Sequence, residues 1–149
     1  MNKKLYIAYG SNLNLEQMSK RCPTAKVIGI SKIRGYKLLF RGAHAGAVAT
    51  IEPVKGEVVP VLVWEITPAD EAALDRYEGW PFLYRKETFK IKVNGKFVEA
   101  MAYIMNEGRP LGKPSHYYYK TILEGYKSAG FKEELLFIAM LDSMKEGQE

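Results

Sequence analysis

The segment that most restricts the fold is a nearly uninterrupted apolar stretch at residues 3–9, which ends at Gly10-Ser11-Asn12. Apolar side chains occupy both the odd and the even positions of this stretch, so it predicts a strand buried on both faces. Asn14 can cap a helix that runs to about Cys22, with Gln17 in the capping-box position. The beginning of the sequence therefore predicts a buried strand, a tight polar turn and a helix.

Further strands are predicted from β-branched and aromatic runs separated by Gly, Pro and charged residues. These runs cover residues 27–31, 36–41, 47–51 and 58–66. Residues 83–93 and 96–105 flank Asn94-Gly95, the strongest two-residue hairpin signal in the sequence, and predict an antiparallel pair. Together the runs predict a mostly antiparallel sheet that is curved or closed.

Helices are predicted where end signals enclose a suitable segment. Thr67-Pro68 is a strong helix start, because Thr is a good N-cap and Pro suits the first helical position, and Gly79 is well placed to end this helix. Two more helices are predicted over residues 115–129 and 132–144. Because the sequence has no repeat, linker or low-complexity tract, we expect residues 1–149 to form a single α+β domain.

Composition narrows the class of protein. A chain of 149 residues with 47% apolar and 26% charged residues can bury a core of its own. It has no run of the roughly 18 apolar residues that a membrane span needs, and its first apolar segment breaks too early for a signal-peptide core. We therefore expect a soluble cytoplasmic protein. The net charge of +5 is scattered rather than gathered in a stripe, and it fits an anionic small-molecule substrate, weak nucleic-acid binding or solubility alone. We expect no nucleic-acid partner.

Cysteine and histidine are scarce. The sequence has one cysteine, Cys22, and two histidines, His44 and His116. One cysteine makes no internal disulfide, and two histidines without a carboxylate spacing signature do not predict a metal site, so we expect no metal. We interpret Cys22 as a small buried side chain and His44 as an exposed residue of the flexible segment 42–47. Nothing around Ser115 or either histidine resembles a nucleophile elbow.

The turn at residues 10–12 is the first candidate site. Its N–H groups are expected to point as those of a helix N-terminus do, which would bind a carboxylate or a developing oxyanion. Glycine at position 10 suits a positive φ or a close ligand approach. The alternative is an ordinary turn, because Gly, Ser and Asn are common turn formers.

Glu78 is the second candidate. It closes the predicted helix, so its carboxylate lies at the negative end of the helix dipole, where the charged form is disfavoured. Shielding by neighbouring side chains would raise the pKa of the carboxyl group further, toward that of a useful general base. The neighbours that could shield it are Tyr77, Trp80, Pro81 and Phe82. The alternative is an exposed glutamate at a frayed helix end.

Three consecutive tyrosines, Tyr117, Tyr118 and Tyr119, follow His116 at the start of a predicted helix. A helix start turns only one or two of these four side chains toward the core, so we expect at least one hydroxyl to be displayed for hydrogen bonding. Stacking on bases is the other use of such a run, but no basic stripe accompanies it.

Several segments together resemble the gamma-glutamylcyclotransferase family, the AIG2-like group. The first is Tyr9-Gly10-Ser11-Asn12-Leu13 after an N-terminal strand, and the second is Leu74-Asp75-Arg76-Tyr77-Glu78-Gly79 after a strand that contains tryptophan. The segment Pro114-Ser115-His116-Tyr117-Tyr118-Tyr119-Lys120, with Gly125 and Ala129-Gly130, is similar to the C-terminal helix of that family. The similarity covers roughly residues 4–130.

The resemblance implies a small mixed β-barrel with flanking helices and an intramolecular acyl transfer. In that reaction the α-amine of a γ-glutamyl group attacks its own γ-carbonyl and releases an amine and 5-oxoproline. Glu78 matches the catalytic glutamate of the family, and Tyr118 matches its substrate-contacting tyrosine. The substrate-binding strand and turn match Tyr6, Ile7, Ala8, Tyr9, Gly10, Ser11 and Asn12. We expect a small γ-glutamyl substrate and no cofactor, because nucleophile and electrophile arrive in one molecule.

Two other functions stay open on the sequence. The same pocket could pass the acyl group to an external amine or to water, as an acyltransferase or hydrolase does, and would then form no 5-oxoproline. A non-catalytic module could instead bind an anionic metabolite without turnover, and its binding would depend little on the basicity of Glu78.

Overall fold

A five-stranded sheet organises the protein, whose computed structural model describes residues 3–146. The strands are β1 (Lys4–Ala8), β2 (Lys26–Arg41), β3 (Val48–Ile66), β4 (Tyr84–Val93) and β5 (Lys96–Met105). In the order β2-β3-β1-β5-β4, β1 is central, antiparallel to β3 and parallel to β5. Tyr6, Ile7 and Ala8 are all buried, which confirms the prediction of a strand covered on both faces.

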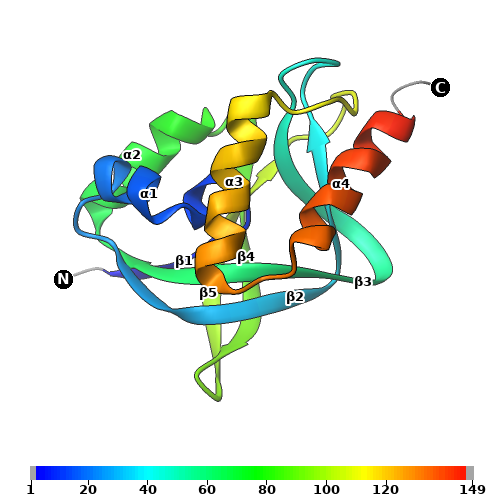
Figure 1. Ribbon diagram of the computed structural model, residues 1–149. Helices are drawn as coiled ribbons and strands as arrows, with labels where there is room; N and C mark the ends of the chain where they lie inside the picture. Colours follow the sequence, from blue (N-terminus) through cyan, green and yellow to red (C-terminus); the bar gives the residue numbers. More distant parts are fainter. Residues whose placement is uncertain (1–2, 147–149) are drawn as a thin grey trace.

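Strands β2 and β3 form one long curved hairpin along the lower part of Figure 1. The four shorter strands predicted from this region are therefore two long ones, and the predicted breaks within them are wrong. Between Arg34 and Tyr36 the ladder shifts register, so that residues 54–57 of β3 stand opposite Gly35 alone. Gly35 has a φ of 79°. A bulge of this kind bends a strand without ending it, because pairing resumes on the far side.

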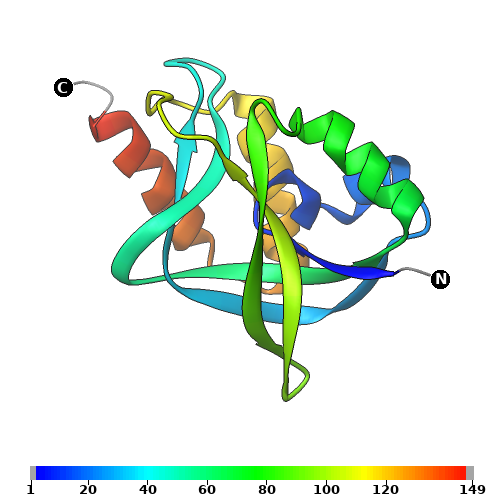
Figure 2. The ribbon, with the colours of Figure 1, turned by 180° about the vertical axis from the view of Figure 1, so that it is seen from behind.

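The α+β class with flanking helices is confirmed, but the sheet is open where a barrel would be closed. Within residues 3–146, the edge strands β2 and β4 share no backbone ladder. The two edges meet through side chains instead. Ser31 Oγ donates to the carbonyl of Lys92 at 2.5 Å, and Asn94 Nδ2 donates to the carbonyl of Ile28 at 3.1 Å. Figure 2 shows the β4–β5 hairpin crossing the long hairpin in this region.

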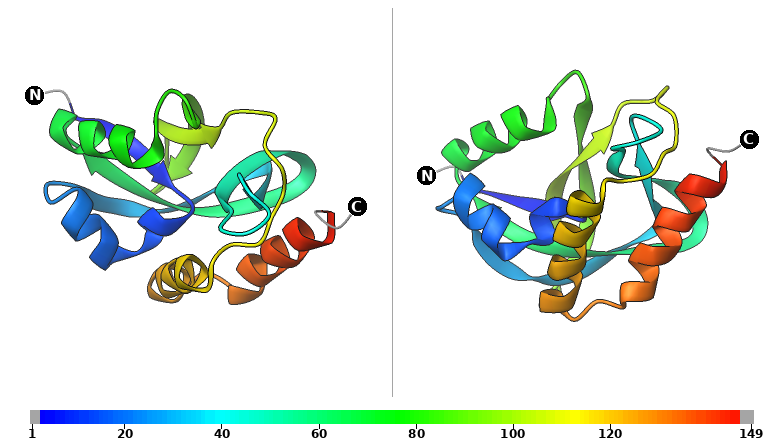
Figure 3. Two further views of the ribbon diagram at one scale, coloured as in Figure 1. Left: turned by 90° about the horizontal axis from the view of Figure 1, so that it is seen from above. Right: turned by 45° about the horizontal axis from the view of Figure 1, so that its top comes forward.

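Four helices pack on the curved sheet, and their ends follow the predicted signals. They are α1 (Leu15–Arg21), α2 (Pro68–Glu78), α3 (His116–Ala129) and α4 (Glu133–Glu146), with a 3-10 turn, η1 (Ser11–Leu13), directly after β1. Asn14 and Ser115 each accept a hydrogen bond from the N–H three residues further on. Gly79 and Gly130 end α2 and α3 in the left-handed conformation. Figure 3 shows α3 standing between the α1–α2 pair and α4.

Two local signals are satisfied in full. Thr67 and Asp70 form a reciprocal capping box, which fixes the start of α2. Asn94 and Gly95 have φ values of 52° and 79° and join β4 to β5 as the predicted two-residue hairpin.

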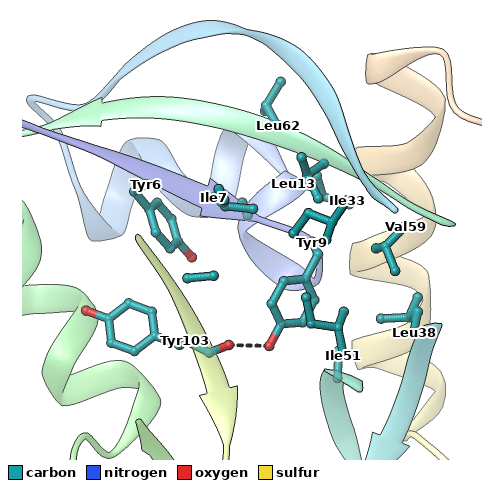
Figure 4. Close-up of a cluster of buried hydrophobic side chains, with 14 of the residues drawn as sticks. Tyr6, Ile7, Tyr9, Leu13, Ile33, Leu38, Ile51, Val59, Leu62 and Tyr103 are labelled. Carbon is teal, nitrogen blue, oxygen red and sulfur yellow. Dashed lines mark hydrogen bonds between the residues drawn. The ribbon is translucent and has the colours of Figure 1, made fainter. Parts of the chain in front are cut away.

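The core forms around β1. Figure 4 shows Ile7 of β1 packed among aliphatic side chains of β2 and β3. Tyr6 of β1 extends toward Tyr103 of β5, and Tyr9 follows directly after β1. In the part of the chain that the structure describes, no helix combines the length and hydropathy needed to cross a bilayer. The core thus fixes the C-terminal end of β1, from which the chain turns into η1.

Candidate active site

A cavity of about 220 Å³ opens where β1 runs into η1. Its wall comes from the end of β1, the last turn of α2, the start of β4, and parts of β3, β5 and α3. The lining residues are Tyr6, Ile7, Tyr9, Gly10, Ser11, Asn12, Val48, Ala49, Tyr77, Glu78, Leu83, Tyr84, Tyr103 and Tyr118. The cavity therefore unites both candidate segments of the sequence, the turn at residues 10–12 and Glu78, and adds Tyr118.

The turn after β1 carries unused backbone donors. Within residues 3–146, the N–H groups of Ser11 and Asn12 donate no hydrogen bond, whereas those of the next two residues close the 3-10 turn. Gly10 has a φ of −121°, so the suggested positive φ is wrong. Glycine is needed for space instead, because a Cβ at this position would lie 3.1 Å from Ala49 Cβ. The two free N–H groups are suited to bind an anionic oxygen at the cavity wall.

Glu78 is the acidic residue of the cavity. Burial raises the pKa of its carboxyl group to about 7, and the positive charge of Arg21 works against this rise. The carboxylate has no hydrogen-bond or ion-pair partner among the described residues. Glu78 is therefore a carboxylate that titrates near neutral pH and keeps its oxygens free for a bound molecule.

The side chains that cover Glu78 are not those predicted from its neighbours in sequence. Trp80 is 42% exposed and Phe82 is 85% exposed, so neither shields the carboxylate. Among the four predicted neighbours, only Tyr77 lines the cavity. The residues that face Glu78 from other parts of the chain are Tyr6 of β1, Tyr9 directly after β1, Tyr84 of β4 and Tyr118 of α3.

Three buried tyrosines brace the cavity wall by donating their hydroxyl protons to protein atoms. Tyr9 donates to the carbonyl of Tyr103 at 2.5 Å, as the dashed line in Figure 4 marks. Tyr84 donates to the carbonyl of Ala49 at 2.5 Å, and Tyr103 donates to Asp75 Oδ1 at 2.6 Å. Burial raises the pKa of all three hydroxyls, so they stay neutral and act as structural donors.

Tyr118 is the tyrosine of α3 that reaches the cavity. Its hydroxyl accepts a hydrogen bond from the N–H of Ala49 at 3.0 Å. Tyr117 is 72% exposed, and Tyr119 lines a separate groove between α3 and α4. The helix register therefore aims one tyrosine of the three at Glu78 and the turn after β1.

Residues 6–124 match the family model described as gamma-glutamyl cyclotransferase, AIG2-like. The chain belongs to the gamma-glutamylcyclotransferase family. The gamma-glutamylcyclotransferases of Mus musculus and Homo sapiens are each 31% identical to it over 141 residues, which cover 87% of this chain and 73% of theirs. A solved structure of a gamma-glutamyl cyclotransferase has a TM-score of 0.79 at 29% identity, over 93% of this chain and 86% of that one.

The residues that the gamma-glutamylcyclotransferase family model matches can be compared with those that line the cavity. The matched residues 6–124 include the turn at residues 10–12, Glu78 and Tyr118, and leave α4 outside. Of the strand and turn residues that the resemblance assigned to substrate binding, all but Ala8 line the cavity. Ala8 is buried in the core cluster instead.

Five residues that line the cavity were not predicted from the sequence. They are Val48, Ala49, Leu83, Tyr84 and Tyr103. Tyr84 and Tyr103 stand in strands that were predicted correctly, and a tyrosine within a strand is a visible signal. Which face such a side chain takes depends on how β5 pairs with β1, and residues so far apart in sequence do not reveal that pairing.

The remaining candidates lie outside the cavity. Cys22 is buried, and burial raises the pKa of its thiol to about 11, in agreement with its interpretation as a small core side chain. His44 and His116 are exposed, and Ser115 caps α3. Among residues 3–146, no three His, Cys, Asp or Glu side chains are grouped so as to hold a metal ion.

Proposed function

We propose that the chain cyclises a γ-glutamyl amine, amino acid or peptide to 5-oxoproline and releases the amine, with Glu78 as general base and then general acid. The observation that carries this proposal is the carboxylate of Glu78, which has a pKa of about 7 and no partner within the described chain. The cavity of about 220 Å³ is smaller than the roughly 300–1,000 Å³ usual for drug-sized ligands, and so suits a γ-glutamyl group rather than a whole peptide.

The first step is removal of a proton from the α-ammonium group of the substrate. At neutral pH this nitrogen is protonated and has no free electron pair with which to attack. A carboxylate whose pKa is near 7 is basic enough to accept the proton and is still partly ionised at that pH. Glu78 then holds the proton, and the free amine attacks the γ-carbonyl carbon of the same molecule.

The second step forms a tetrahedral intermediate whose oxygen is negatively charged. Among the described residues that line the cavity, none is Lys, Arg or His, so the donors for this oxygen are neutral. The unpaired N–H groups of Ser11 and Asn12 are the donors that we assign to it. Each donor of this kind is worth on the order of 3 kcal/mol in other oxyanion holes.

The last step breaks the bond between the γ-carbon and the departing nitrogen. Glu78 passes its proton to that nitrogen, and then takes the remaining extra proton from the ring nitrogen and passes it to the same amine. The amine therefore leaves as an ammonium group, the ring nitrogen becomes the lactam N–H, and the carboxylate is restored. One C–N bond has formed and one has broken, and no water is consumed. Proximity is supplied by the substrate itself, which carries both reacting groups.

A product assay tests the proposal. The purified protein is incubated with γ-glutamyl dipeptides, γ-glutamyl amines and glutathione, and both 5-oxoproline and glutamate are measured. We expect 5-oxoproline from at least one compound and its loss in Glu78→Gln, whose amide keeps the shape of the side chain but accepts no proton at neutral pH. Glu99→Gln, at an exposed position of β5, is the matched control and keeps full activity. Glutamate as the product would mean hydrolysis, and near-normal activity of Glu78→Gln would exclude the mechanism.

A further inference from the structure

Arg21 stands behind the cavity wall and is held by three contacts. Its guanidinium carbon lies 3.4 Å from the ring centroid of Tyr77. One nitrogen donates to Gln17 Oε1 at 3.1 Å, and another donates to Asn12 Oδ1. A guanidinium that is stacked and doubly hydrogen-bonded has a fixed position.

The contact with Arg21 determines which way the buried Asn12 amide faces. Arginine has donors only, so the oxygen of the amide, not its nitrogen, must face the guanidinium. The amide nitrogen then faces the opposite side, where it donates to the hydroxyl of Tyr6 at 2.8 Å. Asn12 is 2% exposed, so water does not compete for these contacts.

The hydroxyl oxygen of Tyr6 therefore accepts a hydrogen bond from Asn12, and its own proton is not donated to any described residue. Tyr9 and Tyr84 differ, because each donates its proton to a backbone carbonyl. Tyr6 lines the same cavity as Glu78, and Figure 4 shows its ring extending from β1 on the side of Tyr103. A neutral tyrosine with an uncommitted proton is a hydrogen-bond donor to whatever occupies the cavity.

We propose that Arg21 is a positioning residue that acts through Asn12 to hold Tyr6 as a hydrogen-bond donor to the α-carboxylate of the bound γ-glutamyl group. This inference rests on the proposed function. The α-carboxylate is attached to the same carbon as the α-amine, which Glu78 deprotonates. Tyr6 faces Glu78, so the nearest substrate oxygen belongs to that carboxylate.

Arg21 also affects the pKa of Glu78, which a residue with a purely structural role would not do. The groups that face Glu78 are Arg21 of α1, Tyr6 of β1, Tyr9 directly after β1, Tyr84 of β4 and Tyr118 of α3. The tyrosines are neutral at pH 7, so Arg21 is the one charge in this set, and it lowers the pKa of Glu78. Removing that charge should move the acid limb of the pH profile of kcat/KM to higher pH.

A double-mutant cycle between Arg21→Gln and Tyr6→Phe tests whether Arg21 acts through Asn12 on Tyr6. At a pH well above the acid limb, where Glu78 is ionised in every variant, we expect each single variant to lower kcat/KM by about tenfold. The double variant should then lose little more than the worse single one, because both changes remove the same hydrogen bond. Arg21→Gln should also shift the acid limb upward, whereas Tyr6→Phe should not. Lys20→Gln removes the same charge from an exposed position of α1 and should change neither quantity.

Asn12→Asp provides an independent variant should Arg21→Gln fold poorly. The second carboxylate oxygen of the aspartate would accept the proton of Tyr6, so this nearly isosteric change should lower kcat/KM as much as Tyr6→Phe does. Combining the two changes should cause no further loss. If the losses in kcat/KM are additive in either cycle, or if the acid limb of Arg21→Gln is not shifted, the proposed role of Arg21 is wrong. The wild-type protein would still turn over substrate in that case. Absence of 5-oxoproline from the wild-type protein would instead reject the proposed function.

Discussion

At the scale of single residues, the property of Glu78 that matters is the balance between burial and nearby charge. Burial disfavours its charged form and raises the pKa of the carboxyl group, whereas Arg21 limits the rise. The result is a pKa of about 7 for a group whose ordinary value is 4.5. An isolated glutamate would be ionised at neutral pH but too weak a base for an ammonium group.

The raised pKa of Glu78 makes stability depend on pH. Between pH 4.5 and 7 the folded protein keeps a proton on Glu78 that the unfolded chain releases, so the contribution of this group to stability is full at low pH and is lost as the pH rises through about 7. We expect Glu78→Gln to gain about 2–3 kcal/mol over the wild type between pH 5 and pH 8. Urea unfolding of both proteins at several pH values measures this, and parallel pH curves would contradict it.

Tyr118→Phe should lower both stability and activity. The change leaves the N–H of Ala49 without its acceptor, which costs about 1–3 kcal/mol, and removes a hydroxyl from the cavity, which should cost about tenfold in kcat/KM. Tyr117→Phe, at a position that is 72% exposed, is the control and should alter neither quantity. An equal loss in that variant would contradict the helix register.

At the scale of elements, the site depends on how closely α3 lies against η1. Gly125 of α3 faces Leu13, and a Cβ at Gly125 would lie 2.6 Å from Leu13 Cβ and 2.7 Å from its carbonyl carbon. Backbone atoms cannot yield as a flexible side chain can, so the contact requires glycine. Because Tyr118 sits two turns earlier on α3, the same contact sets its distance from the turn at residues 10–12.

Gly125→Ala should therefore push α3 away from η1. We expect a loss of about 1–3 kcal/mol in stability, even though alanine favours helices, together with a lower kcat/KM. Lys120→Ala, on the exposed side of the same helix, should cost neither stability nor turnover. A stabilised and fully active Gly125→Ala would show that the contact does not constrain the helix.

At the scale of the whole molecule, α4 supports the sheet at a distance from the cavity. It packs on β2, and the fully buried Ser143 accepts a hydrogen bond from the N–H of Phe40 at 2.9 Å. Ser143 also donates to the carbonyl of Ala139 at 2.7 Å. No residue of α4 lines the cavity among those that the structure describes. Stability and catalysis are thus separable in this part of the protein.

Ser143→Ala should test that separation. It leaves the buried N–H of Phe40 unsatisfied, so unfolding should become easier by about 1–3 kcal/mol while kcat/KM at 25 °C stays unchanged. Leu141→Ala, at a position that is 44% exposed on the same helix, should change stability by less than about 1 kcal/mol. Thermal unfolding and initial rates on the same samples distinguish the two effects, and a matching fall in activity would link α4 to the site.

Local sequence signals predict the helices and the β4–β5 hairpin, together with their ends. Asn14, Thr67 and Ser115 begin helices, Gly79 and Gly130 end them, and Asn94-Gly95 makes a hairpin, because these signals act over four residues or fewer. The turn after β1 and Glu78 could likewise be selected as candidates, since each stands at an element end. For the caps and the hairpin, the residues that make each signal are neighbours along the chain.

How these elements come together around the cavity depends on contacts between distant parts of the chain. The continuous β2–β3 hairpin, the open edge of the sheet and the tyrosines around Glu78 depend on residues far apart in the chain. The side chains expected to shield Glu78, Trp80 and Phe82, are exposed, and the cover comes from β1, β4 and α3. Burial and electric field are sums over everything nearby in space, so the pKa of Glu78 is set by packing that no local pattern encodes.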